Sequence, residues 1–249
     1  MIGSNRINVV IPLAGKDKRF EEKGIFKAFI DIDGKPLIKY CTDNLPFPFL
    51  LKEIRIFFIV LKEHELKYNV KKRLKNLYSE SEIIILDEMT EGSACSILKI
   101  KKEIDNKIPL IVYLADTHFK DDGIVKKEIE LNQDCFGFVP TFKSNLNKYS
   151  YIHVDKDNNF LSVAEKIVIS DNASAGLYYF KHGKDFVWAA EEMIKDDSKR
   201  AGLGEKKWFF ICPVYNELIK IGKKCRIIPV ELVCDLGNED FINEYVKFS

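Results

Sequence analysis

Short apolar runs alternate with polar or amphipathic segments up to residue 141. The apolar runs predict buried β-strands at residues 7–13, 54–60, 82–86, 109–114 and 135–141. The segments between them predict helices at residues 36–44, 63–78, 93–104 and 123–131. Strands of this length separated by helices are typical of βαβ units. The pattern therefore predicts a mostly parallel sheet flanked by helices.

The pattern changes after residue 142. Two short strands at residues 149–154 and 160–165 flank a polar cluster at residues 155–159, which predicts a β-hairpin. The remaining predicted elements are a strand at 173–180, helices at 184–194 and 208–221, a strand at 226–233 and a closing helix at 239–246. No internal repeat or long linker interrupts this order, so we expect a single α/β domain with a mixed sheet.

Composition narrows the choice of partners. Lys and Arg number 39 against 38 Asp and Glu, so the chain lacks the basic excess expected of a protein that binds nucleic acid or a membrane surface. The segment at residues 1–6 is too short and polar to be a signal peptide, and no apolar run is long enough to span a bilayer. None of the six cysteines forms a C-x-x-C pair. We expect a cytoplasmic protein with free thiols, acting on small molecules.

Candidate chemistry follows the predicted strands. In an open α/β sheet, ligands bind beyond the carboxyl ends of the strands. Residues 14–20, 91–94, 115–117 and 235–237 lie at such ends. Taken singly, each has an ordinary explanation: a glycine forms a turn, an aspartate caps a helix, and a lysine or arginine is a solvated charge. Together they would place basic groups, two carboxylates and small residues at one edge of the sheet, as a phosphate-binding site requires.

The order and spacing of these segments are more specific than any one of them. Residues 7–38 read INVVIPLAGKDKRFEEKGIFKAFIDIDGKPLI. They resemble the opening of nucleotide-sugar pyrophosphorylases, where an apolar strand meets an A-G-x-G-[ST]-R-[FL] loop, then a lysine and G-K-P-[LM]-I. Similar segments follow in the family's order, reading EGSA, LAD, AEK, AGLYYF and CDLG from residues 91, 114, 164, 175 and 234. The resemblance covers about residues 7–246 and implies the Rossmann-like (GT-A-like) fold of the NTP-transferase family.

The resemblance implies a role for each matched residue. Arg19 and Lys27 would be catalytic, because an arginine fork can bind pyrophosphate oxygens and a lysine can neutralise charge at the α-phosphate. Asp116 and Asp235 would hold Mg²⁺, which prefers oxygen ligands. The nucleotide-binding residues would be Leu13, Ala14, Gly15, Glu91, Gly92, Ser93 and Ala115, and the acceptor-binding residues Glu165, Lys166 and Gly176. About residues 1–142 would bind the nucleotide and about 143–249 the acceptor.

Three positions depart from the family's pattern. Asp17 stands where the second glycine of the loop is usual, Lys18 where Ser or Thr is usual, and Phe26 where Pro precedes the lysine. An aspartate beside a triphosphate repels it unless the side chain turns outward or pairs with Lys16 or Lys18. A degenerate relative that binds a nucleotide without catalysis is therefore an alternative to an active enzyme.

The activity implied by the resemblance is transfer of a nucleoside monophosphate from an NTP to a small phosphorylated acceptor, with release of pyrophosphate. The first acceptor class is a sugar 1-phosphate for surface or capsular polysaccharides; the alternative is a cytidylyltransferase for phosphocholine or a phospho-amino acid. The short single-domain form favours CTP, with dTTP, UTP and GTP open, and many relatives self-associate, which suggests a homodimer. A glycosyltransferase of this fold would show Asp-x-Asp after a central strand. Both such sequences, at residues 31–33 and 155–157, lie in predicted turns.

Overall fold

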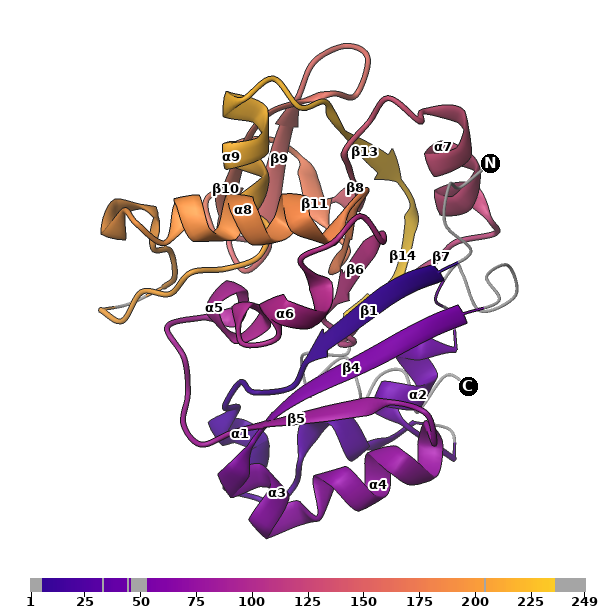
Figure 1. The fold of residues 1–249 in the computed structure, drawn as a ribbon, viewed down its shortest axis with the longest axis vertical. Coiled ribbons are helices and arrows are strands. Elements are labelled where there is room, and N and C mark those ends of the chain that lie inside the picture. Colours follow the sequence, from indigo (N-terminus) through magenta and orange to yellow (C-terminus); the bar gives the residue numbers. More distant parts are fainter. Residues whose placement is uncertain (1–5, 33, 44, 46–52, 204, 236–249) are drawn as a thin grey trace.

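A central β-sheet organises the part of the chain that the computed structural model describes, residues 6–32, 34–43, 45, 53–203 and 205–235. Ten strands form it, in the order β10-β9-β11-β8-β12-β6-β1-β4-β5, with β13 paired to β8 (Figure 1). They are β1 (Arg6–Pro12), β4 (Glu53–Leu61), β5 (Glu82–Leu86), β6 (Leu110–Tyr113), β8 (Gly137–Lys143), β9 (Ser150–Val154), β10 (Phe160–Glu165), β11 (Asn172–Ser174), β12 (Leu177–Phe180) and β13 (Cys225–Pro229).

The sheet is mixed, and its parallel block comes from the first half of the chain. β1 lies between β4 and β6 and is parallel to both, and β5 is parallel to β4. β12 runs antiparallel to β6 and to β8, and β8, β11, β9 and β10 continue antiparallel. The predicted α/β fold, a mixed sheet flanked by helices in a single domain, is confirmed.

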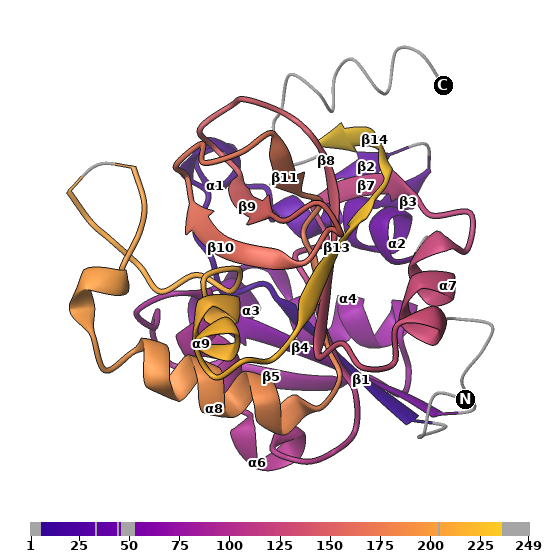
Figure 2. The same cartoon turned by 90° about the horizontal axis from the view of Figure 1, so that it is seen from above.

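Helices cover both faces of the sheet, because side chains along each buried strand alternate between two hydrophobic cores. Val9 and Ile11 of β1 belong to the core beneath α2, α4 and α7, whereas Val10 belongs to the core beneath α5, α6, α8 and α9. Figure 2 shows α2 and α7 on one side of β1 and α6 and α8 on the other. The helices are α1 (Lys18–Glu21), α2 (Leu37–Thr42), α3 (Lys62–Tyr68), α4 (Val70–Leu77), α5 (Ser93–Leu98), α6 (Lys101–Ile104), α7 (Ile124–Leu131), α8 (Gly183–Met193) and α9 (Val214–Lys220), with 3₁₀ turns η1 (Lys27–Phe29) and η2 (Asp197–Lys199).

Two small sheets lie beside the central one. β2 (Asp31–Ile32) pairs with β3 (Lys35–Pro36), and β7 (Thr117–Lys120) pairs antiparallel with β14 (Glu231–Asp235). The sequence pattern did not predict β7, because this strand has only four residues and no extended apolar run. The β7–β14 pair matters for function because its register sets Asp235 opposite Thr117, the residue after Asp116.

Three predicted helices are wrong in extent. The helix expected at residues 63–78 is two helices, α3 and α4, separated by Asn69 in a left-handed conformation (φ 56°) that asparagine tolerates. The helix expected at 208–221 begins only at Val214. Trp208 instead forms an isolated β-bridge with Ala201. The helix at 93–104 is likewise divided into α5 and α6.

Two predicted strands are each two strands. The run at 173–180 divides into β11 and β12 at Gly176, whose φ of 79° interrupts extended backbone. The run at 226–233 divides into β13 and β14, and the second part leaves the central sheet to pair with β7. The closing helix expected at 239–246 lies outside the described residues.

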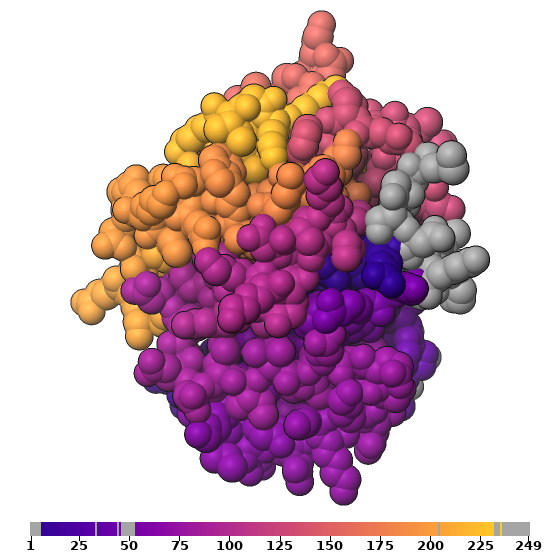
Figure 3. All heavy atoms as spheres, in the orientation of Figure 1, coloured from indigo at the N-terminus to yellow at the C-terminus, as the bar shows by residue number. Residues whose placement is uncertain are grey.

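The surface view shows how the chain is distributed. The purple segments that include α3, α4 and β5 form the lower part of the visible face, and the orange and yellow segments with α8 and α9 form its upper left (Figure 3). Within the described ranges, no helix combines the length and apolarity that crossing a membrane requires. The five cysteines whose side chains are described are all free thiols.

Candidate active site

A cavity of about 230 Å³ opens where β1 and β6 end. Three segments wall it: the loop after β1, the turn that carries Lys27, and the chain leaving β6 at residues 114–116. We call this the strand-end cavity. Of the predicted nucleotide-binding residues, Leu13, Gly15 and Ala115 line it. Ala14 is buried in the core instead.

Lys27 and Asp116 meet in this cavity although 89 positions separate them. Lys27 Nζ donates a hydrogen bond to Asp116 Oδ2 at 2.9 Å. Burial acts to lower the pKa of Lys27, but the charges of Asp116, Asp17 and Asp235 outweigh it and raise that pKa. Lys27 is therefore a fixed positive charge at neutral pH, suited to stabilising an anion rather than to accepting a proton.

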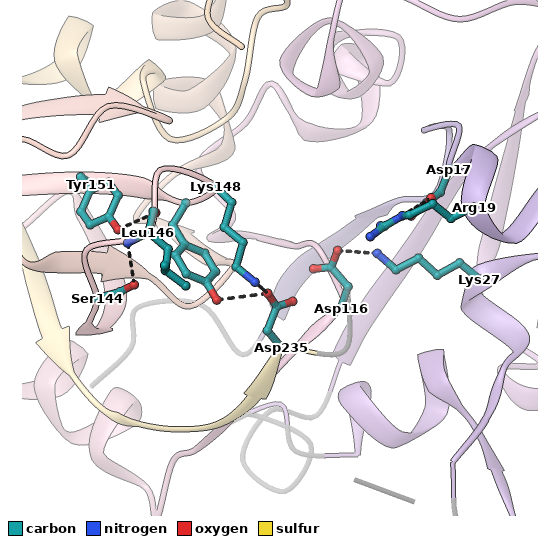
Figure 4. Close-up of polar contacts among 10 residues, drawn as sticks. Asp17, Arg19, Lys27, Asp116, Ser144, Leu146, Lys148, Tyr151 and Asp235 are labelled. Carbon is teal, nitrogen blue, oxygen red and sulfur yellow. Dashed lines mark hydrogen bonds and ion pairs between the residues drawn. The ribbon is translucent and has the colours of Figure 1, made fainter. Parts of the chain in front are cut away.

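Asp235 reaches the same place from the end of the described chain. Figure 4 shows its carboxylate beside that of Asp116, and both act electrostatically on Lys27. Asp235 Oδ2 accepts hydrogen bonds from Lys148 Nζ at 2.6 Å and from the Tyr149 hydroxyl at 3.1 Å. Burial and the neighbouring Asp235 charge raise the pKa of Tyr149, which keeps its hydroxyl protonated as a donor. The structure thus brings the two predicted metal ligands together.

Lys148 and Tyr149 are site residues that sequence reasoning missed. They belong to the loop between β8 and β9, and no motif marks them. The sequence pattern predicted only the strand that follows them, β9. Their contact with Asp235 depends on β14 leaving the central sheet, which the apolar pattern did not reveal.

Ala115 sets the direction of Asp116. Its φ of 55° is a left-handed conformation that non-glycine residues seldom adopt. This turn ends β6 and starts β7 immediately after Asp116, so the carboxylate projects into the cavity rather than along the sheet. The ordinary explanation for Asp116 as a helix cap is wrong, since a strand follows it.

Asp17 has a partner that the sequence did not predict. The sequence predicted repulsion of a triphosphate unless the Asp17 side chain turned outward or paired with Lys16 or Lys18. Its carboxylate lines the cavity and accepts two hydrogen bonds from Arg19, from Nε at 2.9 Å and from Nη2 at 2.6 Å. Lys16 pairs with Glu63 at 2.6 Å. Arg19 itself is not among the residues that line the cavity.

Glu91, Gly92 and Ser93 are not among the residues that line the strand-end cavity. Gly92 has a φ of 135°, and a Cβ there would lie 2.3 Å from the carbonyl oxygen of Phe209. Glu91 pairs with Arg200 at 2.9 Å, and Ser93 begins α5. The glycine is therefore required by close backbone packing. The structure does not bring these three residues to the cavity lining, and their predicted contact with a base stays a prediction.

Hydrogen bonds connect the predicted acceptor-binding residues to segments beside the two carboxylates. The backbone N–H of Lys166 donates to the Tyr149 carbonyl at 2.9 Å. Glu165 is buried and hydrogen-bonded by the Ser150 hydroxyl, and burial raises the pKa of Glu165 to about 7. The Gly176 carbonyl accepts from the N–H of Leu114, which lines the strand-end cavity. These contacts connect the predicted acceptor-binding residues to the strand-end cavity and to the segment that holds Asp235.

Of the two Asp-x-Asp sequences, residues 155–157 form the predicted turn, whereas Asp31 and Ile32 form the short strand β2. The Asp155 carboxylate accepts from the backbone N–H groups of Asp157 and Asn159. That of Asp31 accepts from Gly34 N–H at 2.9 Å. Neither Asp31 nor Asp155 lines the strand-end cavity, which argues against a glycosyltransferase metal motif.

Comparisons with known proteins identify a matching family model and structures of similar fold. A family model described as nucleotidyl transferase matches residues 23–207. A nucleoside-diphosphate-sugar pyrophosphorylase from Vibrio cholerae RC9 superposes with a TM-score of 0.78 at 24% identity, over 96% of this chain and 99% of that one. A UDP-glucose pyrophosphorylase complexed with UDP-glucose superposes with a TM-score of 0.71 at 19% identity, over 96% and 97%. At these identities the two structures show a shared fold. None of the curated proteins compared with the chain matches it.

Proposed function

The chain belongs to the nucleotidyl transferase family, and on that premise we propose that it transfers a nucleoside monophosphate from an NTP to a sugar 1-phosphate, releasing pyrophosphate. The observation that supports this most directly is the meeting of Lys27, Asp116 and Asp235 at the ends of the strands. A fixed cation beside two carboxylates is the arrangement that phosphoryl-group chemistry needs, since catalysis there is positioning and charge stabilisation.

The reaction would use these side chains without a covalent intermediate. An oxygen of the acceptor phosphate attacks the α-phosphorus of the NTP, the bond to the β-phosphate breaks, and pyrophosphate leaves. Lys27 would neutralise the charge that accumulates at the α-phosphate. Arg19 would hold the departing pyrophosphate, and Lys166 the acceptor phosphate, while Glu165 would accept from an acceptor hydroxyl. Each is an electrostatic or positioning role that keeps two anions together.

The two carboxylates fit a magnesium ion. Mg²⁺ commonly uses one or two protein carboxylates and completes its octahedron with water and substrate phosphates. Among the described residues, no group of three or more His, Cys, Asp and Glu side chains could hold a metal, so substrate oxygens would complete the coordination. Bound by Asp116 and Asp235, the ion would supply Lewis-acid stabilisation of the phosphates. Lys27 and Lys148 compensate these carboxylates in their present arrangement.

The acceptor and the base define the finer proposal. A UDP-glucose complex of one structural neighbour supports a sugar phosphate acceptor and keeps UTP in view. The short chain favours CTP by resemblance, which keeps phosphocholine or a phospho-amino acid as the alternative acceptor. We place the product among precursors of surface or capsular polysaccharides on the same resemblance. A homodimer remains part of this proposal.

A pyrophosphate-release assay with Mg²⁺ tests the proposal. It crosses CTP, UTP, dTTP, GTP and ATP with sugar 1-phosphates, phosphocholine and phospho-amino acids. We expect acceptor-dependent release with one NTP, lost in Asp116→Ala and retained in Asp171→Ala, which removes an exposed carboxylate paired with Lys143. Equal release without acceptor, or full activity of Asp116→Ala, would contradict it.

A further inference from the structure

The loop after β1 carries a carboxylate that its usual explanation does not fit. Asp17 precedes α1 with extended backbone (φ −122°, ψ 94°), the position of a capping aspartate, yet its side chain makes no capping hydrogen bond. Both carboxylate oxygens instead accept from Arg19, at 2.9 and 2.6 Å. The Arg19 guanidinium holds the pKa of Asp17 below its ordinary value. Asp17 is therefore an anion committed to one arginine.

The backbone of this loop is also engaged. The N–H of Asp17 donates to Glu21 Oε1 at 3.2 Å, and the same oxygen hydrogen-bonds with Nε2 of the buried His64 at 3.2 Å. Lys16 binds Glu63 of α3 at 2.6 Å. A phosphate-binding nest needs successive N–H groups turned toward the anion. The N–H of Asp17 is directed to Glu21, so this position contributes no nest donor.

We propose that Asp17 is a positioning residue for the NTP: from the cavity wall, its carboxylate holds the Arg19 guanidinium toward the β- and γ-phosphates, on the side of the cavity where Lys27 lies. This inference rests on the proposed function, because it assigns a phosphate ligand to the same cavity. Arg19 then supplies the contact that backbone N–H groups supply in a glycine loop, and the aspartate replaces the glycine without disabling the site.

The contact geometry favours a positioning role for Asp17 over an inhibitory one, in which its ion pair would keep Arg19 from binding phosphate. Asp17 engages Nε and Nη2, the side of the guanidinium, and this uses two of its five N–H donors. The end of the fork, formed by Nη1 and Nη2, is not the edge that Asp17 binds, and a fork can bind a phosphate end-on. The charge of Lys27 also acts on Asp17, so the carboxylate lies near both cations (Figure 4). Phosphate oxygens between Lys27 and Arg19 would contact two positive charges, and the ion pair with Arg19 would offset the negative charge of Asp17.

The test is a double-mutant cycle with Asp17→Ala, Arg19→Ala and the double variant, together with Asp17→Asn, which keeps the shape and removes the charge. Steady-state rates of pyrophosphate release give kcat and KM for the NTP and for the acceptor. We expect Asp17→Ala and Asp17→Asn to lower kcat/KM for the NTP by about tenfold or more, with KM for the acceptor unchanged. In the Arg19→Ala background the Asp17 change should alter kcat/KM by less than about twofold.

Two controls separate this role from a structural one. Asp43→Asn removes another carboxylate that binds two lysines, Lys35 and Lys39, and does not line the cavity, so its kinetics should match the wild type. Thermal unfolding of the Asp17 variants should stay close to that of the wild type. Restoring the family's residues with Asp17→Gly and Lys18→Ser should lower kcat/KM for the NTP. An inhibitory Asp17–Arg19 ion pair would instead predict faster turnover in this variant.

Calorimetric binding of the NTP and of tripolyphosphate to the same variants distinguishes failure of this inference from failure of the proposed function. If the wild type binds the NTP but shows no turnover, the transferase proposal fails. About tenfold weaker NTP binding by Asp17→Ala than by that wild type would still support the positioning role. Normal turnover and binding in Asp17→Ala overturn the positioning role alone. Faster turnover in Asp17→Ala, an equal loss in the Arg19→Ala background, or a wild type that binds neither triphosphate also overturns it.

Discussion

Replacing Glu165 with glutamine should remove a specific pH dependence of stability. Glu165 is 8% exposed, and burial raises its pKa to about 7, while the Ser150 hydrogen bond and the charge of Lys166 act only partly against it. In the unfolded chain the carboxyl titrates near 4.5. Between these values the folded protein retains a proton that the unfolded chain has released, so the free energy of unfolding falls as pH rises through this window.

The size of the effect follows from the two pKa values. Below pH 4.5 the carboxyl is neutral in both states, and above pH 7 it is ionised in both, where the full cost of burying the charge is present. The difference of about 2.5 pKa units corresponds to roughly 3 kcal/mol. Glutamine is neutral throughout and resembles the protonated carboxyl in shape. Relative to the wild type, Glu165→Gln should therefore gain roughly 3 kcal/mol in unfolding free energy between pH 4.5 and pH 8.

Urea unfolding of both proteins at several pH values measures this difference, and other titrating groups cancel because both chains contain them. A thermal melt at pH 8 should show the variant higher by roughly 6–12 °C. Glu217→Gln is the matched control: Glu217 is also buried, but its contacts with Lys199 and Lys220 lower its pKa. The stabilisation by the Glu217 carboxylate is present above the unfolded pKa and is lost as the pH falls through the folded pKa. The difference in unfolding free energy between Glu217→Gln and the wild type should therefore stay nearly constant between pH 4.5 and 8. Parallel pH curves for Glu165→Gln and the wild type would refute the reasoning.

Three further substitutions, with Gly15→Ala as a control, test the site and its scaffold. Asp116→Ala should abolish Mg²⁺-dependent turnover without loss of secondary structure by circular dichroism; wild-type rates would contradict the metal assignment. Lys27→Ala should lower kcat by roughly 10²-fold or more, measured at saturating substrates, and an unchanged kcat would mean that the lysine is not catalytic. Gly92→Ala should cost at least about 2 kcal/mol in urea unfolding, because its Cβ would meet the Phe209 carbonyl at 2.3 Å in a left-handed backbone. Gly15→Ala, with nothing within 4 Å of the new Cβ, should leave stability within about 0.5 kcal/mol; equal losses in both would refute the steric argument.

The sequence predicted the site where the strand-end rule applies. Lys27, Asp116 and Asp235 were each placed after a strand or in a matched motif, and a parallel block of β1, β4 and β6 brings such ends to one edge. That topology explains the position of Asp116 after β6, whereas Asp235 comes beside it through the pairing of β14 with β7.

Contacts that depend on side-chain choice or on strand exchange were beyond prediction. Asp17 could have bound any of three nearby cations, and only the folded loop shows that Arg19 is its partner. Lys148 and Tyr149 reach Asp235 because β14 leaves the central sheet to pair with β7. Hydrophobic periodicity reports which residues are buried, not which strand a segment will join, so it could not reveal this.

The central claim is attack by an acceptor phosphate on the α-phosphorus of an NTP at the strand-end cavity. Its most direct test incubates the protein and Mg²⁺ with the acceptor found by the release assay and its NTP, labelled with ³²P at either the α- or the γ-position. We predict that the α-label appears in the acceptor product, the γ-label in pyrophosphate, and neither in Asp116→Ala. Transfer of the γ-label to the acceptor, or an α-label recovered only as free nucleoside monophosphate, would contradict the account.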